Sequence, residues 1–156
     1  MEVGQQVYTD RNYIYTNVPA ELAGLTAIQT ANDDKRNDVD IRFTIPFSQD
    51  VYVGWDNRHS GLPTWLQNWE LMPELSIATT DENTTLRVYR KTFPAGEVGL
   101  GGTGLSNDDG SAAMYIVAVG TTCSDEDTPN SGMDTDGDGV PDNEDVFPND
   151  STEWSD

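Results

Sequence analysis

The sequence has little positive charge. Its 156 residues include 8 Lys and Arg against 28 Asp and Glu, which gives a formal net charge of −20. A surface with this charge repels nucleic acid and anionic lipid and attracts divalent cations, so we expect neither a nucleic-acid-binding nor a membrane-surface protein. There is also no long apolar run in the sequence, so we expect no transmembrane helix.

Cysteine and histidine are equally scarce. The single cysteine, Cys123, rules out an internal disulfide, and we interpret it as a spectator thiol where a strand ends. The single histidine, His59, leaves no complete Ser-His-Asp or Cys-His set and no His/Cys spacing for a metal. No pair among the many acidic residues is singled out for glycoside cleavage. We therefore expect a chain that is not an enzyme by itself.

The two ends of the sequence suggest a piece of a longer protein. The first ten residues, MEVGQQVYTD, lack the basic and apolar segments of a signal peptide. The last six, STEWSD, resemble a cut within a continuing chain. We expect further domains in the parent chain.

Charge divides the sequence into unlike parts. Residues 1–123 hold 16 acidic and 8 basic side chains, whereas residues 124–156 hold 12 acidic and no basic ones. Residues 121–133 lack periodicity and are rich in Ser, Thr, Asp, Pro and Gly, which is typical of a linker. We therefore predict a domain at 1–120, a linker at 121–133 and an acidic C-terminal unit, truncated here, at 134–156.

Residues 1–120 alternate apolar and polar side chains with a period of two. The alternation is clear at 41–45, 51–55 and 86–88, while residues 114–119 are apolar on both faces, as in a central strand. Turn-forming residues separate these runs. About seven or eight short strands at this spacing predict an all-β fold, an antiparallel β-sandwich.

Two other segments of this domain carry local signals. Residues 62–68 suggest one short helix, because Pro63 suits a first helical turn. The Gly-rich segment GLGGTGLSNDDG, at 99–110, precedes a strand rather than a helix, so we do not expect a phosphate-binding loop there.

The acidic segment DTDGDGVPDNED, at 134–145, has the D-x-D-x-D-G spacing of a calcium-binding loop. Ca²⁺ takes roughly six to eight oxygen ligands, and Gly139 would supply the sharp turn between them. An EF-hand is not expected, since no amphipathic helix flanks the loop. The alternative is a solvated acidic linker without metal. The predicted Ca²⁺ ligands are Asp134, Asp136, Asp138, Val140 through its carbonyl, Asp142 and Asp145.

The longer segment DTDGDGVPDNEDVFPNDSTEWSD resembles a bacterial thrombospondin type 3 repeat. The resemblance implies an irregular Asp-rich unit that recurs in tandem, wraps calcium ions and joins the domains of secreted proteins. Free Ca²⁺ is high only outside cells, so the expected location is extracellular or on the cell surface.

The segment VYVGWDNRHSGLPTWLQNW, at 51–69, contains three of the four tryptophans and allows two interpretations. In the first, exposed rings stack on sugar faces and polar side chains bind the hydroxyls, with Arg58 pairing a uronate or sulfate. Trp69 is the ring we expect to be most exposed. The carbohydrate-binding residues predicted on this interpretation are Trp69, Trp65, Arg58, Asp56 and His59, with Arg11 and Tyr13 from a second aromatic cluster near the N-terminus.

In the second interpretation these side chains are structural. Trp55 alternates with Val51 and Val53 and would point into the core, which we favour for this ring. Asp56 and Arg58 would then form an ion pair that holds the loop. Trp65 is left open between the two interpretations.

The segments VYTDRNYIYTNVP, VYVGWDNRHSGLPTWL, LRVYRKTFPAGEVGLGG and MYIVAVG are similar to accessory β-sandwich modules of secreted marine-bacterial polysaccharide-degrading enzymes. The resemblance implies a non-catalytic carbohydrate-binding module that holds a catalytic domain of the parent chain near pectin, alginate or another polysaccharide. The alternative is a structural or adhesion spacer that binds no sugar. Burial of the tryptophans would favour the spacer.

Overall fold

The fold is all-β, as the sequence predicts, with strands that pair antiparallel. A computed structural model describes residues 1–36, 40–81, 84–103 and 112–120. These residues form eight strands and a single turn of 3-10 helix, η1 at Asn32–Arg36. The strands are β1 Tyr15–Asn17, β2 Thr26–Ile28, β3 Ile41–Ile45, β4 Gln49–Asp56, β5 Glu70–Thr79, β6 Thr85–Phe93, β7 Gly96–Leu100 and β8 Ile116–Val119.

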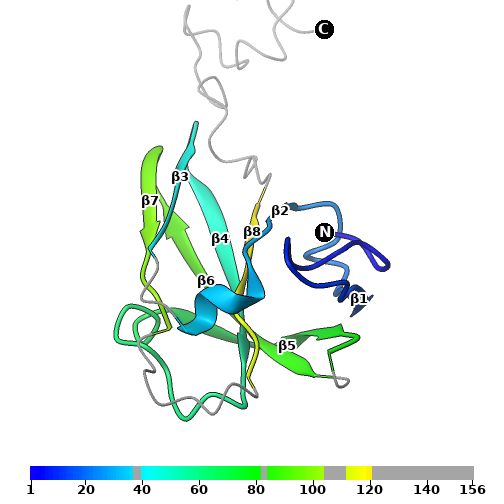
Figure 1. Ribbon diagram of the computed structural model, residues 1–156. Coiled ribbons are helices and arrows are strands. Elements are labelled where there is room, and N and C mark those ends of the chain that lie inside the picture. The colour runs from blue at the N-terminus through cyan, green and yellow to red at the C-terminus, as the bar shows by residue number, and fades with distance from the viewer. Residues whose placement is uncertain (37–39, 82–83, 104–111, 121–156) are drawn as a thin grey trace, which may run out of the picture. The chain divides into compact units, whose positions relative to one another are not determined.

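The strands form two antiparallel sheets. Six lie in the order β1-β5-β6-β4-β8-β2, and β3 pairs with β7 in a sheet of two. In Figure 1 the β3–β7 ribbon lies on one side of β4, while the N-terminal segment with β1 lies on the other. The segment 114–119 was predicted as a central strand, and its β8 portion pairs with β4 on one edge and β2 on the other.

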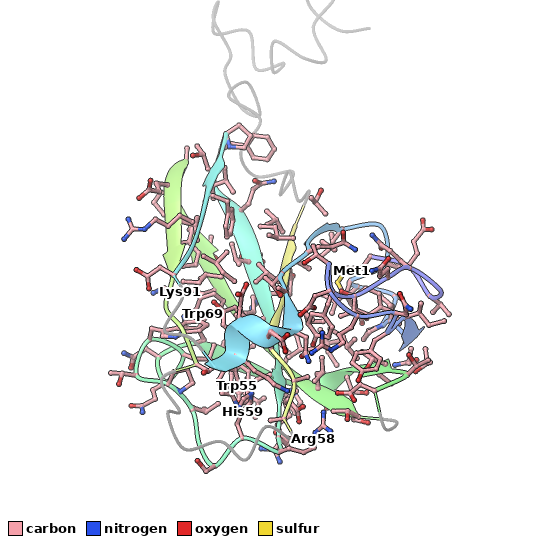
Figure 2. The ribbon with its side chains drawn as sticks, viewed as in Figure 1. Met1, Trp55, Arg58, His59, Trp69 and Lys91 are labelled. Carbon is pink, nitrogen blue, oxygen red and sulfur yellow. The ribbon has the colours of Figure 1, made fainter. Side chains whose placement is uncertain are left out.

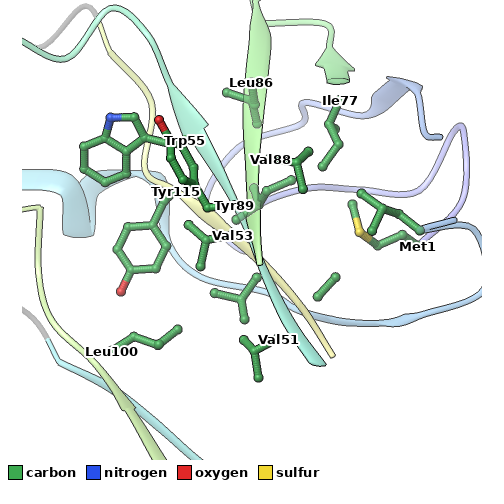
Figure 3. Packing of buried hydrophobic residues seen from close by; sticks show 14 of the residues in the cluster. Met1, Val51, Val53, Trp55, Ile77, Leu86, Val88, Tyr89, Leu100 and Tyr115 are labelled. Atoms are coloured by element: carbon green, nitrogen blue, oxygen red, sulfur yellow. The ribbon is translucent and has the colours of Figure 1, made fainter. Parts of the chain in front are cut away.

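Alternation along β4 explains why both faces of the large sheet are covered. Val51, Val53 and Trp55 point to one face, where Val53 lies opposite Tyr89 of β6, and all four are buried. The other face carries Val88 of β6. Figure 3 shows the resulting two groups of side chains, with Trp55, Tyr115 and Leu100 on one side of the sheet and Met1, Ile77 and Val88 on the other. The core is therefore layered about β4 and β6.

The predicted helix at 62–68 is wrong. The segment is instead a series of turns, in which Leu66 N–H donates to Pro63 O at 3.0 Å and Trp69 N–H donates to Leu66 O at 3.1 Å. Leu66 and Trp69 both point into the core, and Trp65 packs against it. Both hydrogen bonds join residues three apart, as in successive turns, whereas an α-helix joins residues four apart.

Strand β5 was not apparent from the sequence. It contains Pro73, which lacks an N–H for the ladder, and its register against β6 shifts between Met72 and Ser76. Because of this irregularity, β5 does not show the alternation of apolar and polar residues by which the other strands were predicted.

The linker at 121–133, Cys123, and the acidic unit at 134–156 with its predicted Ca²⁺ ligands all lie outside the described residues, so these remain predictions. In the part of the chain that is described, no helix is long and apolar enough to cross a membrane.

Candidate functional site

A cleft of about 250 Å³ opens where β4 ends and the 57–62 loop begins. Three segments line it: the end of β4, the loop, and two residues of β6 that point to the same face of the sheet. The described residues of the lining combine aromatic, amide, hydroxyl and guanidinium groups, and none of them carries a carboxylate. Its members are Trp55, Asn57, His59, Ser60, Gly61, Leu62, Arg87 and Tyr89.

The aromatic part of the cleft is held by hydrogen bonds and ring contacts. Trp55 is 1% exposed, and its indole N–H donates to Gly61 O at 3.2 Å, which fixes the loop against the ring. The His59 ring lies 4.6 Å from Trp55, centroid to centroid, and its Nε2 is 2.8 Å from Ala113 O. Because a carbonyl only accepts, Nε2 carries the proton there. Figure 2 shows Trp55 and His59 next to each other in the lower part of the view.

The polar rim of the cleft consists of exposed side chains. Asn57, Ser60 and Arg87 are all exposed. Arg87 lies directly opposite Trp55 in the β4–β6 register, so its side chain leaves the sheet on the same face as the indole. A rigid aromatic wall beside free hydrogen-bonding groups is the usual composition of a small-ligand site.

Arg58 does not reach this cleft as a free cation, contrary to its predicted role toward a uronate or sulfate. Its Nη2 donates to Asp56 Oδ2 and to Asp81 Oδ2, at 2.7 Å in both cases. Asp56 is completely buried and also accepts the Ala113 N–H at 2.7 Å. The second interpretation, an ion pair that holds the loop, is therefore the one that the structure supports.

The electrostatics of Asp56 agree with this structural role. Burial by itself raises the pKa of the carboxyl, but hydrogen bonds from the Arg58 side chain and from the backbone N–H groups of Ala113 and Arg58 outweigh it. The pKa of Asp56 is consequently lowered from its ordinary value of 3.8. Asp56 is ionised in the folded protein and fully engaged with its partners.

The predicted exposure of Trp69 is wrong. The residue is 7% exposed, and its ring packs on Trp65 at 5.8 Å and on Phe93 at 5.6 Å. Trp65 is half-buried, and its indole N–H donates to Gly102 O at 2.9 Å. The physical reason is the turn structure of 62–68, which directs these rings inward. Neither ring lines the cleft, and Trp69 has no face open for a sugar.

Arg11 and Tyr13 also lie apart from the lining of the cleft. Arg11 pairs with Asp10 at 3.2 Å and with Asp33 at 2.6 Å. Tyr13 is half-buried and meets Tyr8 edge to face, with the centroids 6.4 Å apart. These contacts tie the N-terminal segment together, so we assign the pair no sugar-binding role.

Of the residues predicted for carbohydrate binding, the cleft contains His59 alone. Arg87, Tyr89, Asn57, Ser60 and Leu62 were missed. The signal for Arg87 is weak but real, since an arginine stands between the apolar Leu86 and Val88 and should therefore face away from them. That it would lie opposite Trp55 depends on the β4–β6 register, which a single sequence does not reveal.

Within residues 1–120, as far as the structure describes them, no group of three or more His, Cys, Asp or Glu could hold a metal ion. Asp33 and Asp81 form ion pairs with Arg11 and Arg58, respectively.

Comparison with solved structures finds a similar fold within two glycoside hydrolase chains. The chain is similar to a β-glucuronidase from glycoside hydrolase family 2, with a TM-score of 0.68, 22% identity, and coverage of 76% of this chain and 12% of that one. It is also similar to a GH138 enzyme targeting pectin rhamnogalacturonan II, with a TM-score of 0.57, 14% identity, and coverage of 75% and 14%. The match thus spans about an eighth of each enzyme chain.

No protein-family model matches the chain, and no curated protein matches its sequence. The structural likeness shows the fold: a β-sandwich-type domain that also occurs as a part of two glycoside hydrolase chains.

Proposed function

We propose that this chain is a non-catalytic accessory module of a secreted polysaccharide-degrading enzyme, and that it contacts the glycan through the cleft beside Trp55. One observation carries the proposal: a cleft with an aromatic wall and an exposed polar rim, in a domain whose fold also occurs within glycoside hydrolases. The role of such a module is to keep a catalytic domain close to its polymer, which raises the effective concentration.

The size and chemistry of the cleft support a small sugar contact. Its volume of about 250 Å³ is below the roughly 300–1,000 Å³ of pockets that enclose drug-sized ligands. We infer that it receives one or two sugar residues of a chain. Asn57 and Ser60 supply donors and acceptors for hydroxyl groups, and the half-buried Leu62 offers apolar surface for a sugar ring.

A binding role fits the lining better than a catalytic one. Glycoside hydrolysis usually employs two carboxyl groups on opposite sides of the scissile bond. As far as the structure describes the lining, it includes neither Asp nor Glu, and the adjacent Asp56 is buried and ion-paired. His59 is committed through Nε2 to Ala113 O.

The acidic unit completes the proposal. We propose that residues 134–145 bind Ca²⁺ through Asp134, Asp136, Asp138, Asp142, Asp145 and the Val140 carbonyl, as the spacing and the thrombospondin type 3 resemblance imply. Neutralising these carboxylates would stiffen the segment into a spacer between this domain and its neighbour. Ca²⁺ at extracellular concentration would keep the site filled.

A second candidate function is a structural spacer without sugar binding. The observation that favours it is the inward packing of Trp69, together with the hydrogen bond that holds Trp65 to Gly102. These rings stabilise the domain and are unavailable as a stacking platform.

Affinity electrophoresis of the full chain separates the two candidates. The gels would contain pectin, alginate, carrageenan, agar or a neutral glucan, each with Ca²⁺ and with chelator. We expect retardation by at least one polymer, and weaker retardation of Asn57→Ala. Asn68→Ala is the matched control, since Asn68 is exposed on the same loop region but does not line the cleft. Unretarded migration in every gel would favour the spacer.

A further inference from the structure

Arg87 occupies an unusual electrostatic position at the cleft. It is exposed on β6, and its cross-strand neighbours are Trp55 on one side and Ser76 on the other. Neither neighbour is acidic, and none of the described residues that line the cleft carries a carboxylate. Its guanidinium, which carries five N–H donors, therefore has no acidic partner among these described neighbours.

The other described arginines contrast with this one. Apart from Arg36, whose side chain is not described, each of the remaining four forms an ion pair with a nearby carboxylate. The shortest N–O distances are 2.6 Å for Arg11, 3.1 Å for Arg42, 2.7 Å for Arg58 and 2.6 Å for Arg90. Arg87 forms no ion pair with any carboxylate that the structure describes.

The contrast between Arg87 and the paired arginines matters because basic side chains are scarce in this domain. Residues 1–123 contain 16 acidic and 8 basic side chains, so carboxylates outnumber their partners two to one. A randomly placed arginine would readily find a carboxylate. Among the arginines whose side chains are described, Arg87 is the one without a described carboxylate partner, and it lines the cleft together with the exposed side chains of Asn57 and Ser60.

We propose that the cleft recognises an acidic polysaccharide, and that Arg87 binds the anionic substituent of a sugar residue, a carboxylate or a sulfate. The inference rests on the proposed function and specifies its ligand class. A guanidinium suits either anion because its planar N–H fork makes two parallel hydrogen bonds to two oxygens. Asn57 and Ser60 then bind hydroxyls of the same or the adjacent residue.

The same arrangement explains how an acidic domain can bind a polyanion. At long range the negative domain repels an acidic chain, so steering does not assist binding. In the part of the chain that the structure describes, the carboxylate of Asp56 adjoins the residues of the cleft, and it is engaged by Arg58 and the Ala113 N–H. The charged contact that we propose is therefore short, between the Arg87 guanidinium and the anionic group of the glycan, and salt screens a short contact less than long-range repulsion.

A matched pair of polymers tests this inference. Calorimetry of the full chain would compare de-esterified homogalacturonan with the same polymer after methyl esterification, which removes the charge and keeps the backbone. Chelator is present throughout, so that Ca²⁺ cannot bridge the acidic segment to the polymer. We expect the de-esterified polymer or a sulfated carrageenan to bind at least about tenfold more tightly than methyl-esterified homogalacturonan. Preference for homogalacturonan identifies the carboxylate as the anion, and preference for carrageenan identifies the sulfate.

Two variants assign the effect to one side chain. Arg87→Gln is expected to weaken binding of the preferred acidic polymer about tenfold, to leave the weak binding of the methyl-esterified polymer unchanged, and to keep the melting temperature of the parent. Arg42→Gln makes the same charge change at an exposed pair with Glu97, away from the cleft, and is expected to bind like the parent.

The possible failures are distinguishable. Equal affinity for acidic and methyl-esterified polymers, or an Arg87→Gln variant that binds like the parent, would overturn the acidic-ligand inference and leave the proposed function intact. Absence of heat with every polymer, neutral glucans included, would overturn the proposed function and this inference with it.

Discussion

Arg58 donates two hydrogen bonds to the carboxylate of Asp56, two residues before it in the chain. Its Nε and Nη2 lie 3.0 Å and 2.7 Å, respectively, from Asp56 Oδ2. The pair joins the end of β4 to two distant segments, because Asp56 also accepts the Ala113 N–H and Arg58 also reaches Asp81. Figure 2 shows Arg58 near the end of the sheet at which His59 lies. This ion pair holds the loop that forms one wall of the cleft.

Removing one member of this pair should destabilise the domain strongly. We predict that Asp56→Ala lowers the free energy of unfolding by roughly 3–5 kcal/mol, since it strips a buried charge partner and leaves the Ala113 N–H unsatisfied. Urea unfolding followed by tryptophan fluorescence measures the change. Glu97→Ala is the control, because Glu97 and Arg42 are both more than 60% exposed and the expected cost is below about 1 kcal/mol. Equal effects of the two variants would contradict the assignment.

The same carboxylate should make stability depend on acidity. The pKa of Asp56 is lower in the folded protein than its ordinary value of 3.8, so its contribution is fully present above about pH 4 and is lost as the pH falls through the folded pKa. We predict that acidification from pH 5 to pH 2.5 reduces the stability of the parent more than that of Asp56→Asn, which lacks this titration. Parallel pH profiles for the two proteins would show that Asp56 does not contribute.

A close approach between β4 and β8 gives a steric prediction. A methyl group added at Gly54 would lie 2.6 Å from Cγ1 and 2.9 Å from Cδ1 of Ile116, the residue opposite it in the sheet. We predict that Gly54→Ala costs about 1–3 kcal/mol through overpacking. Gly99→Ala is the matched control, since its new methyl meets nothing within 4 Å, and should leave stability unchanged or slightly increased. A neutral Gly54→Ala in thermal unfolding would contradict the close packing.

Trp69 should affect stability rather than glycan binding. We predict that Trp69→Ala lowers the free energy of unfolding by roughly 3–5 kcal/mol, because the buried ring packs on Trp65 and Phe93. Phe47→Ala serves as the control, as Phe47 is 45% exposed and the expected change is within about 0.5 kcal/mol. A stable Trp69→Ala variant that has lost glycan retardation would restore the stacking role expected from the sequence.

The calcium proposal has an independent test in the acidic unit. We predict that the full chain binds Ca²⁺ with a dissociation constant on the order of 10⁻⁴–10⁻³ M, as extracellular modules do, and that Asp136→Ala weakens this binding by at least about tenfold. Isothermal titration calorimetry, in buffer from which calcium has been removed beforehand with a chelating resin, measures both dissociation constants. Undiminished heat from Asp136→Ala, or none from the parent, would leave residues 134–145 as a solvated acidic linker.

The sequence predicts the class of the fold because alternation is a local property. The patterns at 41–45 and 51–55 became β3 and the middle of β4, and the burial of Trp55 followed from its alternation with Val51 and Val53. Strand β5 was hidden by Pro73 and by the shift of register after Met72. Local pattern is thus informative where a strand is regular and uninformative where it is interrupted.

The cleft was beyond prediction for a different reason. Its walls come from β4, β6 and the 57–62 loop that follows β4. Arg87 reaches the cleft only because the β4–β6 register sets this residue opposite Trp55. The sequence alone does not show which of Arg58 and Arg87 forms an ion pair. They differ in whether a carboxylate lies within reach, and that depends on contacts between residues distant in the chain, such as Arg58 with Asp81.

Nuclear magnetic resonance of the full chain tests the central claim most directly, since each tryptophan indole N–H gives its own signal. Titration with a de-esterified oligogalacturonide is expected to shift the Trp55 indole and the backbone amides of residues 57–62 and 87–89, and to leave the Trp69 indole unchanged. That result would place the glycan in the cleft. Shifts confined to other parts of the chain, or a spectrum unchanged with this probe and with oligosaccharides of carrageenan and neutral glucan, would contradict the account.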